Sequence, residues 1–226
     1  MAITIDQQAL LKLLQLTSPA LPVGAFSYSE GLETLVEQGY LADSATLQNW
    51  LVQELRHGSV QLEVAIAHRA HQNHLVPDQL RYWNQWLTAS RDTAELRQQS
   101  WQMGRALVRL GQKLQPELQP TFAACGTPCN FAVAFGIIAA RWHIDTHTMA
   151  LGYLQSWAAN LIGAAVKLVP LGQTDGQSCL LQLIPELTKA AAHMVTLGDD
   201  ELYVSGWGGA IASMHHETLY TRLFRS

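Results

Sequence analysis

Apolar residues recur every three or four positions along most of this chain, which is the period of a helix that buries one face. The runs within 45–71 and 90–114 show it most clearly. We find no convincing alternation of apolar and polar residues of the kind that a half-buried strand requires, and no internal repeat. The sequence therefore predicts an all-α fold, a single globular helical bundle of about eight to ten helices in which residues 1–226 form one domain.

Glycine, proline and capping residues divide this pattern into elements. The predicted helices cover residues 6–16, 27–39, 45–71 with a break at Gly58, 77–87, 90–114, 127–141, 146–169 and 178–196, the last with Pro185 near its first turns. Non-helical segments are predicted at 115–125, 172–176 and 198–209, with Gly206–Gly209 the loosest part. Asp43 and Asp145 are suitably placed to cap the helices that follow them.

The segment after the first helix has the most distinctive local chemistry. Pro19 and Pro22 exclude a helix there, because each fixes its own φ and restricts the preceding residue. Gly24 permits a turn that a side chain would resist. Ser27 and Glu30 then have the spacing of a capping box. The sequence predicts a rigid non-helical entry and a helix that begins at this box.

One predicted helix raises the question of a membrane span. Between Asp145 and Lys167 the chain carries no charge. Polar side chains are nevertheless spread through it: His147, Gln155, Ser156 and Asn160. No basic cluster flanks it, so we interpret it as the central helix of a soluble bundle rather than a membrane helix. Lys167 itself suits the last turn, where a cation interacts favourably with exposed carbonyls.

The charge content and cysteine count of the chain indicate which kinds of partner and compartment to expect. Charged residues make up 14% of the chain, against about 25% in an average domain, which suggests an oligomer or a standing partner. A net charge of -4 and the lack of a Lys/Arg run argue against a nucleic-acid surface. The N-terminus does not resemble a signal peptide, and three cysteines do not form a disulfide framework. We therefore expect a cytoplasmic protein.

Metal and enzyme chemistry find weaker support. His68, His71 and His74 lie three residues apart, but the outer two diverge around a helix and no other ligand has a typical spacing beside them. Cys125 and Cys129 lie four residues apart, which only weakly suggests a metal site or a redox pair, and we interpret them as two small apolar residues at a loop-to-helix junction. Signatures of a nucleophile elbow, a phosphate loop or a dinucleotide site are missing. The sequence indicates a binding protein that is not an enzyme and has no cofactor.

The C-terminal segment 217–226 is unusual for a chain end, because such ends are commonly polar and frayed. It carries the aromatic and arginine side chains that anchor interfaces. These residues are Tyr220, Arg222, Phe224 and Arg225. We predict that this tail docks onto a partner.

Four segments resemble a known family. The opening segment S-P-A-L-P-V-G-A-F-S-Y-S-E-G-L-E is similar to the N-terminal signature of the UreF family of urease accessory proteins. The run R-W-H-I-D-T-H-T-M-A-L-G-Y-L-Q-S-W-A-A-N-L-I-G-A-A-V-K-L-V-P-L-G-Q resembles the family's central helix and the turn after it. The ending H-E-T-L-Y-T-R-L-F-R-S resembles its C-terminal signature, and Glu95-Leu96-Arg97 with Gly104 is a weaker block. Glu30, His215 and Leu219 depart from the commonest family residues.

The resemblance implies a urease maturation factor that dimerises and binds UreD, called UreH in some species. It also implies recruitment of the GTPase UreG to apo-urease and regulation of GTP-dependent nickel insertion, with nickel as cargo. Lys167 matches the family lysine implicated in gating GTPase activity, and the tail residues match the part that orders on UreD/UreH binding. The opening residues match a block of structural or interfacial role: Pro22, Gly24, Phe26, Tyr28 and Glu30.

Two other functions remain as alternatives at this stage. One is a metallochaperone that binds nickel through His68, His71 and His74, and the more distant one is an unrecognised hydrolase. Unlike the first interpretation, they require this chain itself to bind a metal ion or to catalyse a reaction.

Overall fold

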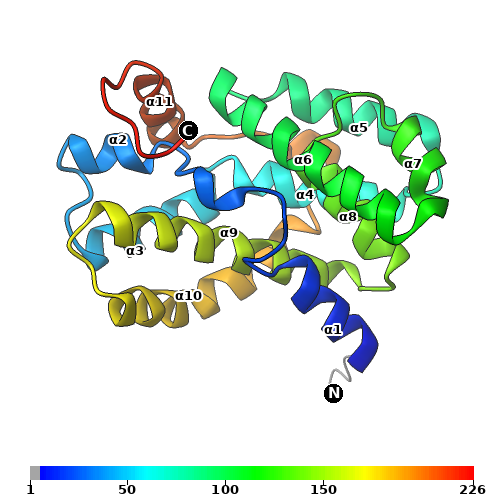
Figure 1. Ribbon diagram of the computed structural model, residues 1–226, viewed down its shortest axis with the longest axis horizontal. Helices are drawn as coiled ribbons and strands as arrows, with labels where there is room; N and C mark the ends of the chain where they lie inside the picture. Colours follow the sequence, from blue (N-terminus) through cyan, green and yellow to red (C-terminus); the bar gives the residue numbers. More distant parts are fainter. Residues whose placement is uncertain (1–5) are drawn as a thin grey trace.

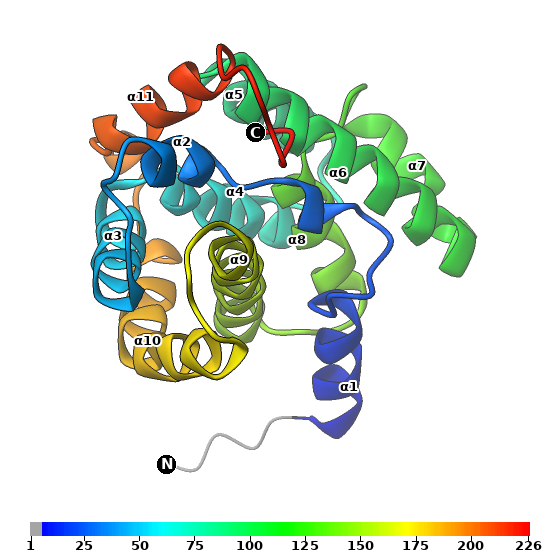
Figure 2. The same cartoon turned by 60° about the vertical axis from the view of Figure 1, so that its left-hand side comes forward.

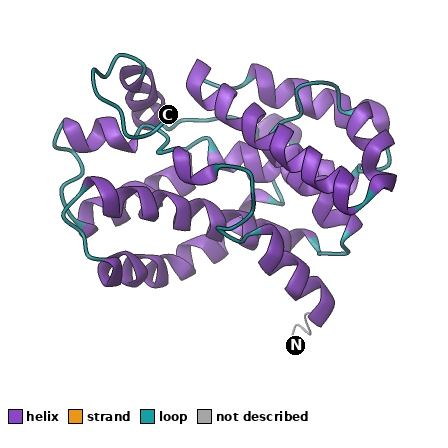
Figure 3. Cartoon of the chain, viewed as in Figure 1, coloured by secondary structure: helices purple, strands orange, loops and turns teal. Residues whose placement is uncertain are grey.

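A computed structural model describes residues 6–226, and within them every regular element is helical (Figure 3). This confirms the all-α prediction, with eleven α-helices in the described part of the chain, one more than the upper end of the predicted range. The α-helices are α1 (Gln7–Leu16), α2 (Leu32–Glu37), α3 (Ser44–His57), α4 (Val60–Gln72), α5 (Pro77–Ala89), α6 (Ala94–Leu114), α7 (Gln119–Ala124), α8 (Phe131–Arg141), α9 (Thr146–Leu168), α10 (Gln173–Met194) and α11 (Trp207–His216). Short 3₁₀ helices cover Ala25–Ser27, Pro116–Leu118 and Asp199–Glu201.

Helix α9 is the central helix of the bundle, and several other helices pack against it (Figure 1). Figure 2 looks almost along it and shows α1, α3, α4, α8 and α10 arranged around it. The Asp145 side chain accepts a hydrogen bond from the Thr148 amide at 3.0 Å, so this predicted cap is confirmed. No helix within 6–226 combines the length and apolarity needed to cross a bilayer. Apolar residues of α9 instead face the surrounding helices.

Helices α4 and α8 cross closely beside α9. All residues from Ala132 to Ala140 of α8 are buried. At Gly136 an added Cβ would lie 2.2 Å from the carbonyl oxygen of Ala67, so the backbones meet without an intervening side chain. The small residues of α8 therefore set the spacing at the centre of the core.

The predicted helix start at Ser27 is wrong. Ser27 ends a 3₁₀ helix, Tyr28 is extended, and Glu30 has a φ of 55°. The α-helix begins only at Leu32, after Gly31 with a φ of 82°. The capping residues are used elsewhere, because the carboxylate of Glu30 accepts hydrogen bonds from distant side chains. Tertiary hydrogen bonds have replaced the local cap.

Three segments predicted to be non-helical contain helices. Residues 115–125 include α7, because prolines at the starts of its short helices occupy positions where a missing N–H costs nothing. At the predicted turn 172–176, the Gly172 amide donates to Asp175 at 3.2 Å, and α10 starts at Gln173. Gly206–Gly209, predicted to be loose, contains the N-cap and first turn of α11.

The other helix boundaries follow the sequence more closely. Gly39, with a φ of 78°, ends α2, and Gly58 separates α3 from α4. Pro77 begins α5 as predicted. Pro185 was expected near the first turns of α10 but lies in its interior, because that helix starts earlier than the sequence indicated.

Candidate functional site

The opening segment and the tail lie side by side. The Arg225 amide donates to the Ser27 carbonyl at 2.8 Å, and the Ser29 amide donates to the Ser226 carbonyl at 2.7 Å. The Ser29 hydroxyl donates to the same carbonyl of Ser226 at 2.6 Å. Figure 1 shows the two segments meeting beside α2 and α11. The two most distinctive parts of the sequence therefore form one structural unit.

The tail side chains divide into two groups. Phe224 is 5% exposed and Ser226 is buried, so these residues anchor the tail to its own chain. Tyr220 is fully exposed and Leu223 is 62% exposed. Arg222 pairs with Glu95 of α6 at 2.9 Å and keeps part of its side chain in solvent. The sequence predicted that all the tail residues contact a partner. The structure instead separates buried residues, which attach the tail to its own chain, from exposed residues, which are free to contact another protein.

The opening residues divide in the same way. Tyr28 is buried, and its hydroxyl donates to the Gln102 side chain at 2.8 Å. Pro22 and Phe26 are exposed, and Gly24 adopts a φ of 79° where the 3₁₀ helix begins. Glu30 turns inward.

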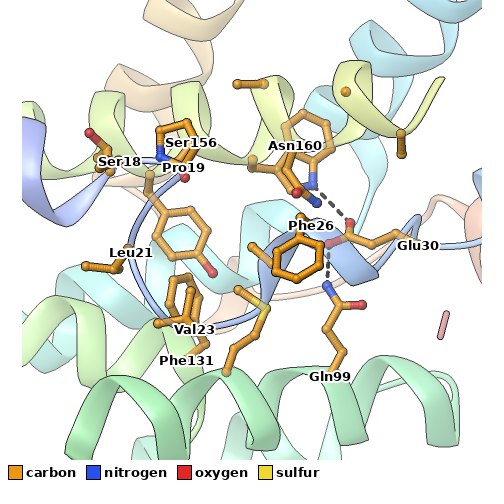
Figure 4. Close-up of a pocket in the computed structure, with 18 of the residues that line it drawn as sticks. Ser18, Pro19, Leu21, Val23, Phe26, Glu30, Gln99, Phe131, Ser156 and Asn160 are labelled. Carbon is orange, nitrogen blue, oxygen red and sulfur yellow. Dashed lines mark hydrogen bonds between the residues drawn. The ribbon is translucent and has the colours of Figure 1, made fainter. Parts of the chain in front are cut away.

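A cavity of about 360 Å³ lies behind this segment (Figure 4). Its walls come from the opening segment and from α6, α8 and α9, and apolar side chains such as Leu21, Met103 and Phe131 line much of it. Lys167 also lines it, and the Nζ of Lys167 lies 5.5 Å from the centroid of the Phe224 ring. Lys167 therefore connects the cavity to the anchored part of the tail.

Glu30 is one of several largely enclosed carboxylates in this region. It accepts hydrogen bonds from Gln99 Nε2 at 2.7 Å and Trp157 Nε1 at 3.0 Å, which are dashed in Figure 4. Glu63 is paired with Arg91 and also accepts from the Tyr153 hydroxyl at 2.7 Å. Burial, followed by the Glu63 charge, raises the pKa of Glu30 to about 7.

Glu54 of α3 lies on the other side of Glu30. Burial raises the pKa of Glu54 to about 7, and the charges of Glu30 and Asp92 add to the effect. A raised carboxyl pKa stabilises the fold below the unfolded value of about 4.5, and that contribution is lost as pH rises through about 7. Ionised Glu54 therefore opposes folding in alkaline solution.

Replacing Glu54 by Gln should stabilise the protein at pH 8.5 by on the order of 2–3 kcal/mol and change little at pH 4.5, because glutamine stays neutral. Urea unfolding at the two pH values measures this difference. Glu37→Gln, at an exposed position in the neighbouring helix α2, is the control and should have little effect at either pH. A gain for Glu54→Gln that is equal at both pH values would contradict the assignment.

The histidines and cysteines do not converge on a metal site. Within residues 6–226, no group of three or more His, Cys, Asp or Glu side chains is arranged to hold a metal ion. A ring nitrogen of His71 is bonded to the Ile144 carbonyl at 2.7 Å, and one of His74 to the His71 carbonyl at 2.9 Å. Cys125 and Cys129 are buried, and the adjacent Cys125 thiol together with burial raises the pKa of Cys129 well above its ordinary value. The geometry does not favour the histidine-based alternative.

The chain also matches known proteins in sequence. A protein-family model described as UreF matches residues 41–184. A urease accessory protein UreF from Nostoc is 55% identical over 99% of this chain and 98% of its own length. The chain belongs to the UreF family. Further UreF relatives from Synechocystis (51% identical, covering 98% of this chain and 100% of the relative) and Alkalilimnicola ehrlichii (42%, 95% of each) support this membership.

The UreF-model match includes Lys167 but neither the opening segment nor the tail, which lie within the near full-length matches to the relatives. Sequence reasoning missed other residues that organise this site. Glu33 accepts a hydrogen bond from the Leu223 amide of the tail and also contacts the buried His216 ring, and Glu54 and Arg91 belong to the group of charged side chains around Glu30 and Glu63. Their partners lie far away in sequence, so no local spacing signals them.

Proposed function

We propose that this UreF-family chain is a non-catalytic urease maturation factor that binds UreD/UreH and recruits the GTPase UreG to apo-urease. It thereby regulates GTP-dependent insertion of nickel, which is its cargo rather than its cofactor. The observation that carries the proposal is the unit formed by the opening segment and the tail. Its inner residues are held by the chain itself, while Tyr220 and Leu223 remain exposed.

The composition of the exposed groups fits a protein partner. Aromatic and arginine side chains are enriched where interfaces bind most strongly, and the tail presents Tyr220 and part of Arg222 to solvent. Because backbone groups of residues 224–226 are already hydrogen-bonded to the rest of the chain, ordering them on binding costs less conformational entropy. We propose that UreD/UreH binds here, that the factor acts as a homodimer within the assembly, and that it works in the cytoplasm.

Co-expression with UreD/UreH and UreG, followed by size-exclusion chromatography with light scattering, tests this function. We expect one co-eluting species of twofold stoichiometry. A protein that elutes alone in the presence of both partners, yet retains nickel after gel filtration, would overturn the proposal and favour the histidine-based alternative.

Replacing Lys167 by Ala should change GTP turnover by the assembled complex severalfold while costing less than about 1 kcal/mol of stability. Lys167 is exposed at the last turn of α9, where the loss of a favourable helix-end charge and a cation–π contact has a modest cost. Lys113→Ala is a matched control, because Lys113 is exposed in the last turn of α6. Equal GTP turnover by the wild type and both variants would contradict a regulatory role for Lys167.

A further inference from the structure

The cavity behind the opening segment combines an apolar lining with two carboxylates. Its volume of about 360 Å³ lies within the range of small-molecule pockets, which is roughly 300–1,000 Å³. Leu21, Val23 and Met103 are among the apolar side chains of its walls, and Glu30 and Glu63 supply the carboxylates. A ligand that suits this space therefore has an apolar body and one group that a carboxylate binds well.

Glu30 is the carboxylate of the cavity that lacks a counter-ion. Its two hydrogen bonds come from neutral donors, Gln99 Nε2 at 2.7 Å and Trp157 Nε1 at 3.0 Å (Figure 4). Glu63, by contrast, is paired with Arg91. Glu30 forms no ion pair with any residue that the structure describes. Because an enclosed carboxylate without a counter-ion is costly, a cation that enters the cavity would be stabilised beside it.

The other charged groups around Glu30 strengthen this preference for a cation. Glu54 of α3 lies on the far side of Glu30, and Asp92, which is exposed, adds a further negative charge. Arg91 supplies a positive charge, but Glu63 already pairs with it. The charge of Glu30 therefore remains uncompensated inside the fold.

Aromatic rings line the same cavity. Phe131, Phe135, Tyr153 and Trp157 all contribute to its walls. The ring centroid of Tyr153 lies 5.7 Å from that of Phe131 and 5.0 Å from that of Phe135, so these three rings form one cluster. The face of an aromatic ring attracts an ammonium group, as a carboxylate does. The two features together select a cation over a neutral molecule of the same shape.

Lys167 is the lining residue whose charge opposes a cation. It lies ten residues beyond Trp157 in α9, which is a rise of about 15 Å along the helix. Lys167 is also exposed in the last turn. Since solvent and salt screen charges over about 10 Å at 0.1 M ionic strength, its repulsion of a cation at Glu30 is small.

We propose that the cavity binds a small primary ammonium compound with an apolar body, an arylalkyl- or alkylamine in its protonated form. The ammonium group contacts the Glu30 carboxylate and the aromatic faces, while the apolar body lies against Leu21 and Met103. An ionised carboxylate has about four lone-pair sites, so Gln99 and Trp157 keep their hydrogen bonds to Glu30 when the ligand binds. This site is independent of the urease maturation role, because it concerns a ligand of the isolated chain.

Calorimetric titration of the full chain with three compounds of similar size tests the proposal: 2-phenylethylammonium, 2-phenylethanol and phenylacetate. Burial and the Glu63 charge raise the pKa of Glu30 to about 7, so at pH 8 most of Glu30 is ionised. A primary amine, with a pKa of about 10, is still protonated there. We expect the ammonium compound to bind with a Kd below about 1 mM and at least about tenfold more tightly than the alcohol, and phenylacetate not to bind.

Three results would overturn the proposal. They are equal affinities for the ammonium compound and the alcohol, tighter binding of phenylacetate, and no binding of the ammonium compound. The first would indicate an apolar pocket without charge selection, and the second a site governed by Lys167. The indole N–H signal of Trp157 in a nuclear magnetic resonance spectrum locates the ligand, because this group donates to Glu30. A signal that does not shift at saturation would place the ligand elsewhere and also contradict the proposal.

Two variants complete the experiment. Glu30→Gln removes the charge and keeps one amide oxygen, so it should bind the ammonium compound and the alcohol with about equal affinity. Glu37→Gln, at an exposed position of α2, is the control and should retain the preference of the wild type. A preference that survives in Glu30→Gln would exclude Glu30 as the ammonium contact. If that variant does not fold, the three-compound comparison and the Trp157 signal of the wild type decide.

Discussion

Truncation of the chain after Leu219 should abolish co-purification with UreD/UreH, a loss of more than about 100-fold in affinity. The deletion removes the exposed Tyr220 and also the backbone groups of Arg225 and Ser226 that pair with the opening segment. Both parts of the proposed interface are then lost together. Pull-down and size-exclusion chromatography of the co-expressed proteins measure the result, and an unchanged complex would contradict the role of the tail.

Two point variants separate the anchor from the contact surface. Tyr220→Ala should weaken the complex by about 30-fold, the effect of an interface hot spot, with an unchanged melting temperature because the side chain is fully exposed. Phe224→Ala should instead destabilise the isolated chain by about 3 kcal/mol, since its ring is buried. A thermal melt of each variant distinguishes a lost contact from a lost anchor.

Replacing Gly136 by Ala should destabilise the fold by about 2–3 kcal/mol, which lowers the melting temperature by roughly 4–12 °C. The added Cβ would stand 2.2 Å from the Ala67 carbonyl oxygen and 3.0 Å from its carbonyl carbon. Both atoms belong to the backbone of α4, so no side chain can rotate away. The helices would have to separate in the part of the core where α8 is most completely buried.

Gly163→Ala is the matched control for this variant. Gly163 also lies inside a helix, but no heavy atom lies within 4 Å of its added Cβ. Alanine favours the helix over glycine by up to about 1 kcal/mol, so this change should raise the melting temperature slightly. Thermal unfolding of both variants provides the measurement, and an equal loss in both would contradict the close α4–α8 approach.

The sequence by itself determined the helical class, most helix boundaries and the family. Its period of three to four residues, the cap at Asp145 and the glycine at 39 are local signals, and each depends on hydrogen bonds or dihedral angles within a few residues. The family resemblance rested on short contiguous motifs. These are the properties that a linear pattern can carry.

Only the tertiary structure decided how the distinctive segments are used. The capping box predicted at Ser27 does not form, because the Glu30 carboxylate accepts hydrogen bonds from Gln99 and Trp157 instead. The Ser29 hydroxyl likewise donates to the Ser226 carbonyl. Burial separated Phe224 from Tyr220 although both are aromatic residues of one tail. The charged clusters could not be read from spacing, since their members come from helices far apart in the chain. Their roles depend on desolvation and on partners that meet only when the helices pack.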